Sequence, residues 1–260
     1  MKVLVISHMY PSTFSAVEGI FVHQQVKELQ KKGCEVRVIS PVPLTPLPVK
    51  CLTRKWSAYS KIPPKTTWDG IKVYYPRFLQ FPKSLFFASS GKRMYLGIRK
   101  LVAELYRDFK FDIIHAHVAL PCGFASMMVK KEYSKPLMVT IHGQDLQVTI
   151  YRNDACREAL AKVFRGADRI ATVSTKLQRI AEANFGFAEK LVVISNGISP
   201  DEIASEKTEL ASRYAGSRVI LSVSHLIKSK GPDLNIRAIS QLAQKHPDLK
   251  YVVIGAGTET

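Results

Sequence analysis

The sequence predicts a doubly wound α/β fold, in which helices cover both faces of a mainly parallel β-sheet. Short runs of β-branched and other apolar residues alternate along the chain with longer amphipathic stretches. Strands that are apolar on both faces are typical of parallel sheets covered by helices. The 260 residues are 46% hydrophobic and 23% charged, which is enough apolar material to bury a substantial core.

The first strand and the first helix are expected at residues 3–7 and 19–32. Four apolar residues in succession open the strand, whereas the helix carries apolar side chains at helical spacing, namely Ile20, Val22, Val26 and Leu29. Gly33 ends the helix, and a second strand follows at residues 35–40.

The same alternation returns in the middle of the chain and again near its end. The expected strands are 112–117, 137–141, 169–173, 191–194, 218–224 and 250–254, and the expected helices are 119–133, 154–165, 175–185 and 233–245. Turn-forming residues at 196–200 place a domain boundary near residue 200. We therefore expect an N-terminal domain at 1–200, followed at 201–260 by a linker and one βαβ unit of a second, Rossmann-like domain. Because one such unit cannot bury both faces of its sheet, we expect the chain to be truncated within that domain.

Between the second and third expected strands lies a stretch that breaks the alternation. Residues 41–48 contain four prolines, which exclude a helix or a central strand because proline lacks an amide donor. Residues 50–110 hold 14 basic and 3 acidic residues, interleaved with large aromatic side chains. Residues 85–109 have the pattern of an amphipathic helix in which Leu85, Met94, Leu101, Leu105 and Phe109 pack while Lys92, Arg93, Arg99, Lys100 and Arg107 remain free. We expect a ligand-binding and membrane-facing surface here; the alternative is a solvated helix with an ordinary core stripe.

Charge narrows the classes of partner. The chain has 38 basic and 21 acidic residues, a formal charge of +17, and most of the excess lies in residues 1–130. Such a chain attracts anions, so the candidate partners are a nucleic acid, an anionic membrane or a phosphorylated small molecule. No nucleic-acid-binding motif accompanies the basic residues, and we therefore expect no nucleic-acid partner.

The sequence favours a reducing, cytoplasmic compartment. The four cysteines lie too far apart in the sequence to form a Cys-x-x-Cys pair or a set of metal ligands with the usual spacing. The apolar run at the N-terminus is shorter than the core of a signal peptide, and the longest uncharged run, 113–129, is too short and too polar to span a bilayer. We expect a cytoplasmic protein that binds the inner face of the cell membrane peripherally.

Histidines at the ends of two expected strands are the first candidates for chemistry. His115 and His117 end one strand and share a face of it, because alternate strand residues do, and His142 follows the next strand. Open α/β sheets bind ligands at the carboxyl ends of their strands. We interpret His117 and His142 as hydrogen-bonding or acid–base groups in a cleft, and His115 as a core residue. A metal site formed by the three histidines and Asp145 is the alternative; since no spacing fixes such a ligand set, we expect no metal.

Two strand-to-helix loops have features of phosphate-binding sites. Glu18 and Gly19 directly precede the first helix, and a glycine there offers free N–H groups and the positive end of the helix dipole to an anion. Lys230 and Gly231 stand in the same position before a later helix, with His225 earlier in that loop. The Gly-x-Gly-x-x-Gly fingerprint does not follow the first strand, which argues against a dinucleotide oxidoreductase, and the chain contains no Asp-x-Asp pair.

The order of these motifs resembles that of the retaining glycosyltransferases of family 4, which have the two-domain GT-B fold. The matching segments run the length of the chain and comprise the loop from Pro11 to Gly19, then 112–117, 139–145, 167–174 and 193–198, and finally Lys230-Gly231 and 252–257. Within the family, residues 142–150 resemble bacterial transferases that build teichuronic acid and other cell-surface polysaccharides.

The resemblance implies roles for individual residues. Gly19 would approach the donor diphosphate through backbone N–H groups, Lys230 would pair with the same diphosphate, and His142 would act catalytically beside the reacting sugar. His225 belongs to the same diphosphate loop and stands where the family usually has Arg. The family's paired glutamates have no counterpart within the 260 residues. We expect the acceptor cleft to be lined by Glu18, His117 and Asp145.

The implied function is the transfer of a sugar from a nucleotide-diphosphate sugar to a cell-surface polysaccharide or a lipid-linked acceptor, with retention of configuration and without a metal or other cofactor. The expected partners are the nucleotide sugar, the glycan or lipid-linked acceptor and an anionic membrane surface. The alternative is a non-catalytic module that binds an anionic glycan or lipid.

Overall fold

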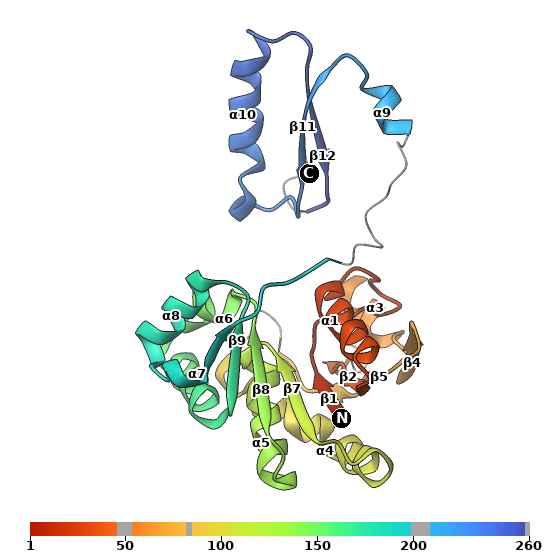
Figure 1. Ribbon diagram of the computed structural model, residues 1–260, viewed down its shortest axis with the longest axis vertical. Coiled ribbons are helices and arrows are strands. Elements are labelled where there is room, and N and C mark those ends of the chain that lie inside the picture. The colour runs from red at the N-terminus through yellow and green to blue at the C-terminus, as the bar shows by residue number, and fades with distance from the viewer. Residues whose placement is uncertain (46–53, 82–84, 199–208, 258–260) are drawn as a thin grey trace. The chain divides into compact units, whose positions relative to one another are not determined.

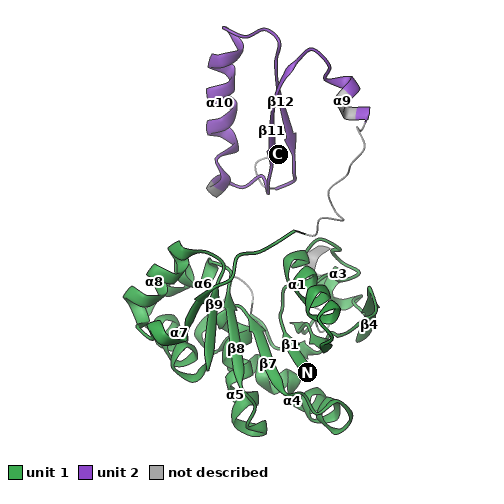
Figure 2. Ribbon diagram, in the orientation of Figure 1, with its two compact units in different colours: residues 1–198 green, residues 199–260 purple. Residues whose placement is uncertain are grey.

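The structure, a computed structural model of the chain, describes residues 1–45, 54–81, 85–198 and 209–257 (Figure 1). The chain divides into two compact units, Met1–Ile198 and Ser199–Thr260, beside the boundary predicted near residue 200 (Figure 2). The end of the proline-rich segment, Cys51 and the last three residues lie outside the described residues.

Unit 1 is built on one eight-stranded sheet, which confirms the predicted α/β fold with a mainly parallel sheet. The strand order is β10-β9-β8-β7-β1-β2-β5-β4, and every neighbouring pair is parallel except β4 with β5. The strands are β1 (Lys2–Ile6), β2 (Glu35–Ile39), β4 (Lys65–Trp68), β5 (Ile71–Tyr74), β7 (Ile113–His117), β8 (Leu137–Ile141), β9 (Arg169–Thr172) and β10 (Leu191–Val193). A separate parallel pair comprises β3 (Val42–Pro43) and β6 (Arg77–Phe78).

Helices cover the sheet of unit 1, and local capping fixes where several of them begin. Asn153 caps α7 by accepting a hydrogen bond from the Cys156 amide at 2.8 Å, and Ser174 caps α8 in the same way. The helices are α1 (Ile20–Lys31), α3 (Arg54–Ser60), α4 (Ser90–Phe109), α5 (Phe124–Tyr133), α6 (Gln144–Gln147), α7 (Asp154–Gly166) and α8 (Thr175–Phe185). Shorter helical turns are η2 (Phe87–Ser89), η3 (Ala119–Gly123), η4 (Thr149–Tyr151) and η5 (Ala188–Lys190).

Alternate side chains of the central strand β1 enter two different cores. Val3 and Val5 pack in the core that includes Val22 and Val26 of α1, whereas Leu4 and Ile6 pack in the larger core that includes residues of α4, α5 and α7. Each core is completed on one face of the sheet, because successive strand residues point to opposite faces.

The connections leaving β1 and β7 create the point at which this fold binds ligands. β1 lies between β2 and β7, so the chain first builds the sheet in one direction from β1 and later builds it in the other. At such a reversal the loops that follow the two central strands diverge and leave a crevice at the carboxyl ends of the strands. In unit 1 those loops are the ones from β1 to α1 and from β7 to α5.

Two predicted helices begin later than expected. The helix predicted at 119–133 begins at Phe124, because the preceding turn η3 contains Leu120 with φ −119° and ψ 128°, and a residue before proline is disfavoured in the helical region. The helix predicted at 85–109 begins at Ser90, after Phe86 adopts a φ of 52°. Leu85 is therefore outside the helix and 57% exposed, instead of packing as predicted.

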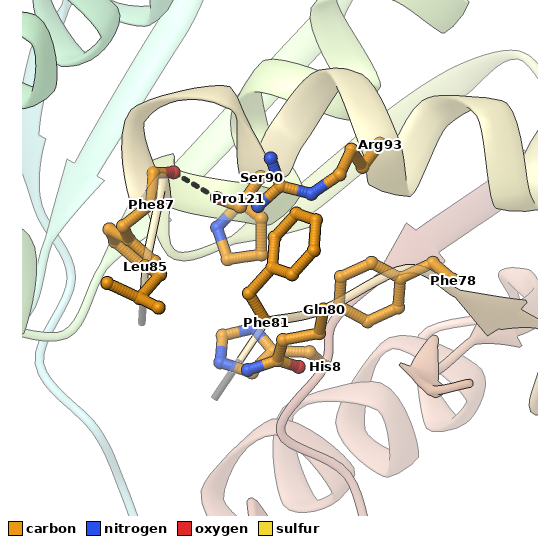
Figure 3. Close-up of a pocket in the computed structure, with 9 residues that line it drawn as sticks. All are labelled: His8, Phe78, Gln80, Phe81, Leu85, Phe87, Ser90, Arg93 and Pro121. Atoms are coloured by element: carbon orange, nitrogen blue, oxygen red, sulfur yellow. Dashed lines mark hydrogen bonds between the residues drawn. The ribbon is translucent and has the colours of Figure 1, made fainter. Parts of the chain in front are cut away.

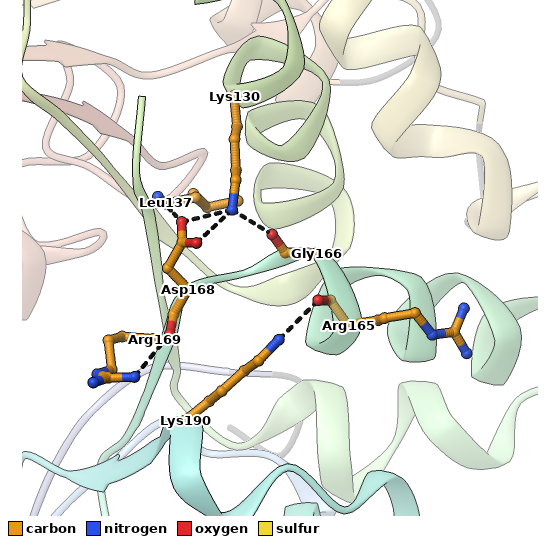
Figure 4. A network of polar contacts seen from close by, with 7 residues as sticks. All are labelled: Lys130, Leu137, Arg165, Gly166, Asp168, Arg169 and Lys190. Carbon is orange, nitrogen blue, oxygen red and sulfur yellow. Dashed lines mark hydrogen bonds and ion pairs between the residues drawn. The ribbon is translucent and has the colours of Figure 1, made fainter. Parts of the chain in front are cut away.

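A polar network holds the amino-terminal edge of the sheet in unit 1 (Figure 4). The Lys130 ammonium of α5 lies 2.6 Å from both carboxylate oxygens of Asp168 and donates to the Gly166 carbonyl at 3.0 Å. Asp168 also accepts from the Leu137 amide at 2.7 Å, and Lys190 donates to the Arg165 carbonyl at 2.9 Å. These contacts join the ends of α5 and α7 to the starts of β8 and β9.

Unit 2 contains the predicted βαβ arrangement. Its described elements are α9 (Glu209–Arg213), β11 (Arg218–Val223), η7 (Lys228–Lys230), α10 (Pro232–Ala243) and β12 (Leu249–Ile254), and β11 is parallel to β12. Within the described part of unit 2 no residue is buried, and apolar side chains such as Leu221, Val223 and Leu234 are more than half exposed. Across the described parts of both units, no helix combines the length and apolarity needed to cross a membrane.

Candidate functional site

Three histidines meet at the carboxyl edge of the sheet in unit 1, where β7 and β8 end. His117 is the last residue of β7 and pairs in register with Thr140 of β8, which places it next to the start of the loop that carries His142. His115 lies two residues earlier on the same face, with its ring centroid 4.4 Å from that of His117. The predicted placement of His115 in the core agrees with its 6% exposure and its 2.8 Å hydrogen bond to the Thr140 hydroxyl.

His117 and His142 form a stacked, hydrogen-bonded pair. Nδ1 of His117 lies 3.0 Å from Nε2 of His142, and the rings are inclined by 16° with their centroids 5.3 Å apart. Burial, together with the neighbouring His8, lowers the pKa of His142 to about 4. Burial followed by the neighbouring imidazoles holds the pKa of His117 well below 6.5. Both rings are therefore neutral at pH 7, and one donates to the other.

The neutral pair leaves two nitrogen atoms for further chemistry. Nε2 of His117 and Nδ1 of His142 are buried and have no hydrogen-bond partner among the described residues. The His142 ring also packs against Phe21 of α1, with 4.6 Å between the ring centroids. Such a group offers a directed hydrogen bond in a dry environment, where hydrogen bonds to developing charge are most effective.

Gly19 occupies the position that the sequence predicts, at the N-terminus of α1. Its φ of 68° and ψ of 23° are left-handed, and a Cβ atom there would overlap the carbonyl group of Met9. No other residue type fits without moving the loop that follows β1. The first turn of α1 therefore begins beside the carboxyl end of β1 with its amide groups pointing along the helix axis toward the edge of the sheet.

A polar cavity of about 210 Å³ opens beside this loop. Its lining joins residues of the β1–α1 loop to residues after β2 and around β5, including His8, Tyr10, Ser12, Glu18 and Tyr59. Glu18, a predicted cleft residue, is thus one of its walls and is exposed. Burial, with a smaller effect of the Glu18 charge, raises the pKa of Tyr59 to about 12, so its hydroxyl stays protonated.

A smaller, mainly apolar cavity of about 50 Å³ shares part of that lining (Figure 3). His8, Phe78 and Gln80 border both cavities, so the two are adjacent. The small cavity extends toward the turn before α4, and its remaining lining residues are Phe81, Leu85, Phe87, Ser90, Arg93 and Pro121. A ligand that fills both would have one polar portion and one short apolar portion.

Arg93 is not free, which corrects the prediction that placed it among the solvated cations of α4. Its guanidinium donates to the Leu79 carbonyl at 3.0 Å, to the Ser89 hydroxyl and to the Phe86 carbonyl, and it lies 4.9 Å from the Phe81 ring centroid. The side chain therefore shapes the wall of the small cavity.

Asp145 lies at the same edge of the sheet but faces the backbone of the neighbouring loop. It is 1% exposed, and its carboxylate accepts hydrogen bonds from the Ala119 amide at 2.8 Å and the Leu120 amide at 3.2 Å. Nowhere in the described part of the chain do three or more His, Cys, Asp or Glu side chains gather in a group that could hold a metal ion. Asp145 thus binds the Ala119 and Leu120 amides.

The remaining predicted residues belong to unit 2. His225 follows β11, and Lys230 ends the turn η7 directly before Gly231, whose φ of 63° caps α10. Both His225 and Lys230 are exposed. Within unit 2 they occupy the loop at the carboxyl end of β11, as predicted.

A hydrogen-bonded chain behind the β1–α1 loop was not predicted from the sequence. The Tyr10 hydroxyl lies 2.8 Å from Nδ1 of His23, and Nε2 of His23 lies 3.0 Å from the Asp69 carboxylate, which also pairs with Lys27 at 3.2 Å. Asp69 and Gly70 form the turn between β4 and β5. The Asp-Gly dipeptide between two alternating segments is a hairpin signal that could have revealed this element.

Two family models match the chain, one over most of each unit. The family model described as Glycosyltransferase Family 4 matches residues 19–202, and the model described as Glycosyl transferases group 1 matches residues 205–260. A Bacillus subtilis protein named as a teichuronic acid biosynthesis glycosyltransferase, TuaC, is 31% identical over 99% of this chain. A Mycolicibacterium smegmatis protein, named as a GDP-mannose-dependent phosphatidylinositol monomannoside mannosyltransferase, is 23% identical over 78% of it. The chain spans 66% and 51% of the lengths of these two relatives.

Solved structures show the same fold. Sucrose-phosphate synthase from Thermosynechococcus elongatus superposes with a TM-score of 0.68 at 12% identity, over 98% of this chain and 70% of that one. HepE of Anabaena, in complex with UDP and glucose, gives a TM-score of 0.62 at 20% identity, over 99% of this chain and 61% of that one. With a family model that matches most of the chain and GT-B glycosyltransferases as structural neighbours, the chain belongs to glycosyltransferase family 4.

Proposed function

We propose that this chain takes part in transferring a sugar from a nucleotide-diphosphate sugar to a cell-surface polysaccharide or a lipid-linked acceptor. The observation that carries the proposal is the match of both units to glycosyltransferase models, together with the buried, neutral histidine pair at the carboxyl edge of unit 1. The proposed reaction retains the configuration of the sugar and uses no metal or other cofactor.

Each unit is proposed to have one diphosphate-binding element, namely the N-terminus of α1 in unit 1 and the loop that carries Lys230 in unit 2. Gly19 supports this role because its left-handed conformation lets the loop pass close to the first turn of α1, whose amides attract an anion. Lys230 and His225 supply positive charge or hydrogen bonds from unit 2. That HepE was solved with UDP and glucose makes a uridine nucleotide the first donor to test.

The acceptor is proposed to occupy the polar cavity of unit 1. Its volume of about 210 Å³ suits one sugar ring, and its walls combine the Glu18 carboxylate with the Tyr59 side chain and several other polar groups. Aromatic and polar side chains together are suited to a sugar, which presents both C–H faces and hydroxyl groups.

His142 is proposed to act on the reacting sugar as a neutral hydrogen-bonding group. Its lowered pKa excludes a stable positive charge at pH 7, and Nδ1 has no partner among the described residues. A neutral imidazole can orient a sugar hydroxyl, whereas the stabilisation of the departing nucleotide diphosphate falls to Lys230 and the amides of α1.

The exposed cations of α4 are proposed to face an anionic membrane at its inner surface. Lys92, Arg99, Lys100 and Arg107 are exposed, and the apolar residues Met94, Ile98, Val102 and Leu105 of the same helix are buried in unit 1. The attraction is therefore electrostatic, and each basic residue near an anionic surface contributes about 1 kcal/mol.

The proposed function is tested by incubating the chain with labelled UDP-glucose, UDP-N-acetylglucosamine and GDP-mannose, together with cell-surface glycan or vesicles that carry lipid-linked sugars. We expect little or no transfer by the 260 residues alone. In a form extended to the length of its relatives, His142→Ala should lower the rate about 100- to 1000-fold, and Lys230→Ala should weaken transition-state stabilisation by about 2–4 kcal/mol. His246→Ala is the matched control in unit 2. NMR of the product gives the anomeric configuration, and a chelator should leave the rate unchanged.

Two outcomes would contradict the proposal. Inverted configuration or a rate abolished by a chelator would exclude the stated reaction. Binding of glycan or vesicles with no consumption of any nucleotide sugar would instead support the non-catalytic binding module.

A further inference from the structure

We infer that Asp145 is a positioning residue, whose buried carboxylate clamps the β7–α5 loop and thereby fixes the His117–His142 pair. Its effect on sugar transfer rests on the proposed function, whereas the clamping of the loop does not. The inference differs from the expectation that Asp145 lines the acceptor cleft, because it assigns the side chain to the backbone of the protein.

The geometry of the carboxylate satisfies two neighbouring amides at once. Oδ2 accepts from the Ala119 amide at 2.8 Å and Oδ1 accepts from the Leu120 amide at 3.2 Å. Among side chains of this length only a carboxylate presents two acceptor atoms, since an asparagine in the same place would turn its NH₂ group toward one of the donors. A buried amide left without a partner costs about 1–3 kcal/mol.

The loop that Asp145 holds is strained at its first residue. Val118 has a φ of 73° and a ψ of 132°, a region that a β-branched residue rarely occupies. Strain of this kind costs about 1–3 kcal/mol and persists only where surrounding contacts enforce it. Here the Val118 amide donates to the Thr140 carbonyl at 2.8 Å and the Gly123 amide donates to the Val118 carbonyl at 2.9 Å. The carboxylate of Asp145 supplies the next two acceptors along the loop.

Holding the loop in this way carries a desolvation cost, because the Asp145 carboxylate is buried. The pKa of Asp145 is raised to about 6 by burial, despite the opposing effect of the Ala119 and Leu120 amides. The two amides thus offset part of the cost of burying the negative charge.

The clamp connects three loops that meet at the carboxyl edge. Asp145 belongs to α6, three residues after His142, and the loop that it holds begins directly after His117. At its far end that loop carries Cys122, whose sulfur lies 3.2 Å from both the amide and Nδ1 of His8 in the β1–α1 loop. If the hydrogen bonds of the Asp145 carboxylate were lost, both Val118, which follows His117, and the contact between Cys122 and His8 would therefore be released.

The test measures the loop directly, in the unmodified chain and in Asp145→Asn, without any assay of transfer. Native-state alkylation is quantified at each cysteine by mass spectrometry. We expect Asp145→Asn to raise the labelling rate of Cys122 at least tenfold while Cys156, buried in α7, keeps its rate. Gln144→Ala, an exposed change in the same turn, is the matched control and should alter neither.

A spectroscopic readout separates positioning from general loosening. Imidazole signals of His117 and His142 should shift in Asp145→Asn, those of His225 and His246 in unit 2 should not, and none should move in Gln144→Ala. Unchanged His117 and His142 signals, unchanged labelling of Cys122, or equal increases at Cys122 and Cys156 would each overturn the inference.

Hydrogen exchange of the unmodified chain keeps the inference falsifiable if Asp145→Asn does not fold. The Ala119 and Leu120 amides should exchange as slowly as amides within β7. Exchange at the rate of exposed loop amides would overturn the clamp. Intact clamping with no sugar transfer by any variant would instead count against the proposed function alone.

Discussion

Buried imidazoles dominate the response of unit 1 to acid. Burial lowers the pKa values of His8 and His115 to about 4, and of His142 likewise, and it holds that of His117 well below 6.5. In the unfolded chain imidazoles titrate near 6.5, so between pH 6.5 and 4 the unfolded state binds more protons and stability falls as the pH falls. Asp145 has the opposite effect on stability as the pH falls, because its pKa is raised from 3.8 to about 6. Its single carboxyl group is outweighed by the four imidazoles.

The first prediction follows from this loss of stability as the pH falls. The free energy of unfolding of unit 1 should decrease steadily from pH 6.5 to pH 4.5, and His115→Gln should reduce the total decrease by roughly 1–3 kcal/mol while keeping a hydrogen bond to Thr140. Urea unfolding followed by the fluorescence of Trp56 and Trp68, both in unit 1, measures it. Stability that is flat over this range, or the same slope in His115→Gln, would contradict it.

The second prediction concerns the hydrogen-bonded chain behind the β1–α1 loop. Tyr10→Phe removes the hydroxyl that lies 2.8 Å from Nδ1 of His23, a residue that is 4% exposed. A buried nitrogen then lacks a partner, and the free energy of unfolding should fall by about 1–3 kcal/mol. Tyr151→Phe, an exposed change, is the control and should be neutral; a neutral Tyr10→Phe would show that the hydroxyl is dispensable.

At the scale of elements, α4 divides its faces between packing and charge. Met94, Ile98, Val102 and Leu105 are buried, whereas Lys92, Arg99 and Lys100 are exposed. The helix is 20 residues long and presents these cations without exposing its apolar stripe. Attachment to a membrane through α4 should therefore depend on lipid charge and weaken with salt.

The third prediction tests this division. Replacing Lys92, Arg99 and Lys100 by Ser should lower the affinity for vesicles of anionic lipid about a hundredfold at low salt, since three charges contribute about 3 kcal/mol. Sedimentation with the vesicles measures this affinity. Replacing Arg165, Lys176 and Arg179 by Ser is the charge-matched control on α7 and α8. Equal binding of wild type to neutral vesicles would refute an electrostatic attachment.

Periodicity predicted the elements that bury their own apolar pattern and missed those that depend on distant partners. The strand 137–141 and the helix 175–185 were predicted with their observed bounds, because each carries a complete apolar pattern and clear ends. The β4–β5 hairpin has only four residues in each strand, too few for a period to stand out. The role of Asp145 was beyond reach because its partners, Ala119 and Leu120, are 26 and 25 residues away.

At the scale of the whole molecule, the two units differ in how they are stabilised. Both hydrophobic cores consist of buried residues between Val3 and Ala181, and no described residue of unit 2 is buried. Unit 1 therefore contains the apolar contacts that its own folding requires. Gly19 and His142 lie in unit 1, and Lys230 lies in unit 2.

The fourth prediction is that residues 1–198 fold without the rest of the chain. Their urea midpoint, followed by tryptophan fluorescence, should equal that of the 260-residue chain, because the apolar residues buried in unit 1 are contacted from within it. A lower midpoint would show that unit 2 contributes to the stability of unit 1. If Lys230 and His225 bind the nucleotide as proposed, nucleotide binding should be weaker in the shorter chain, which lacks both.

The Lys130–Asp168 network has a consequence for how the sequence of such a protein can evolve. It fastens the amino-terminal edge of the sheet, opposite the carboxyl edge where His117 ends β7 and where the loop after β8 carries His142. Substitutions at the amino-terminal edge should thus lower the amount of folded protein without changing the specificity of the site. Substitutions in the loops at the carboxyl edge should change specificity and leave the amount of folded protein nearly unchanged. A sheet fastened in this way can accept replacement loops from a distant homologue at its carboxyl edge and still fold.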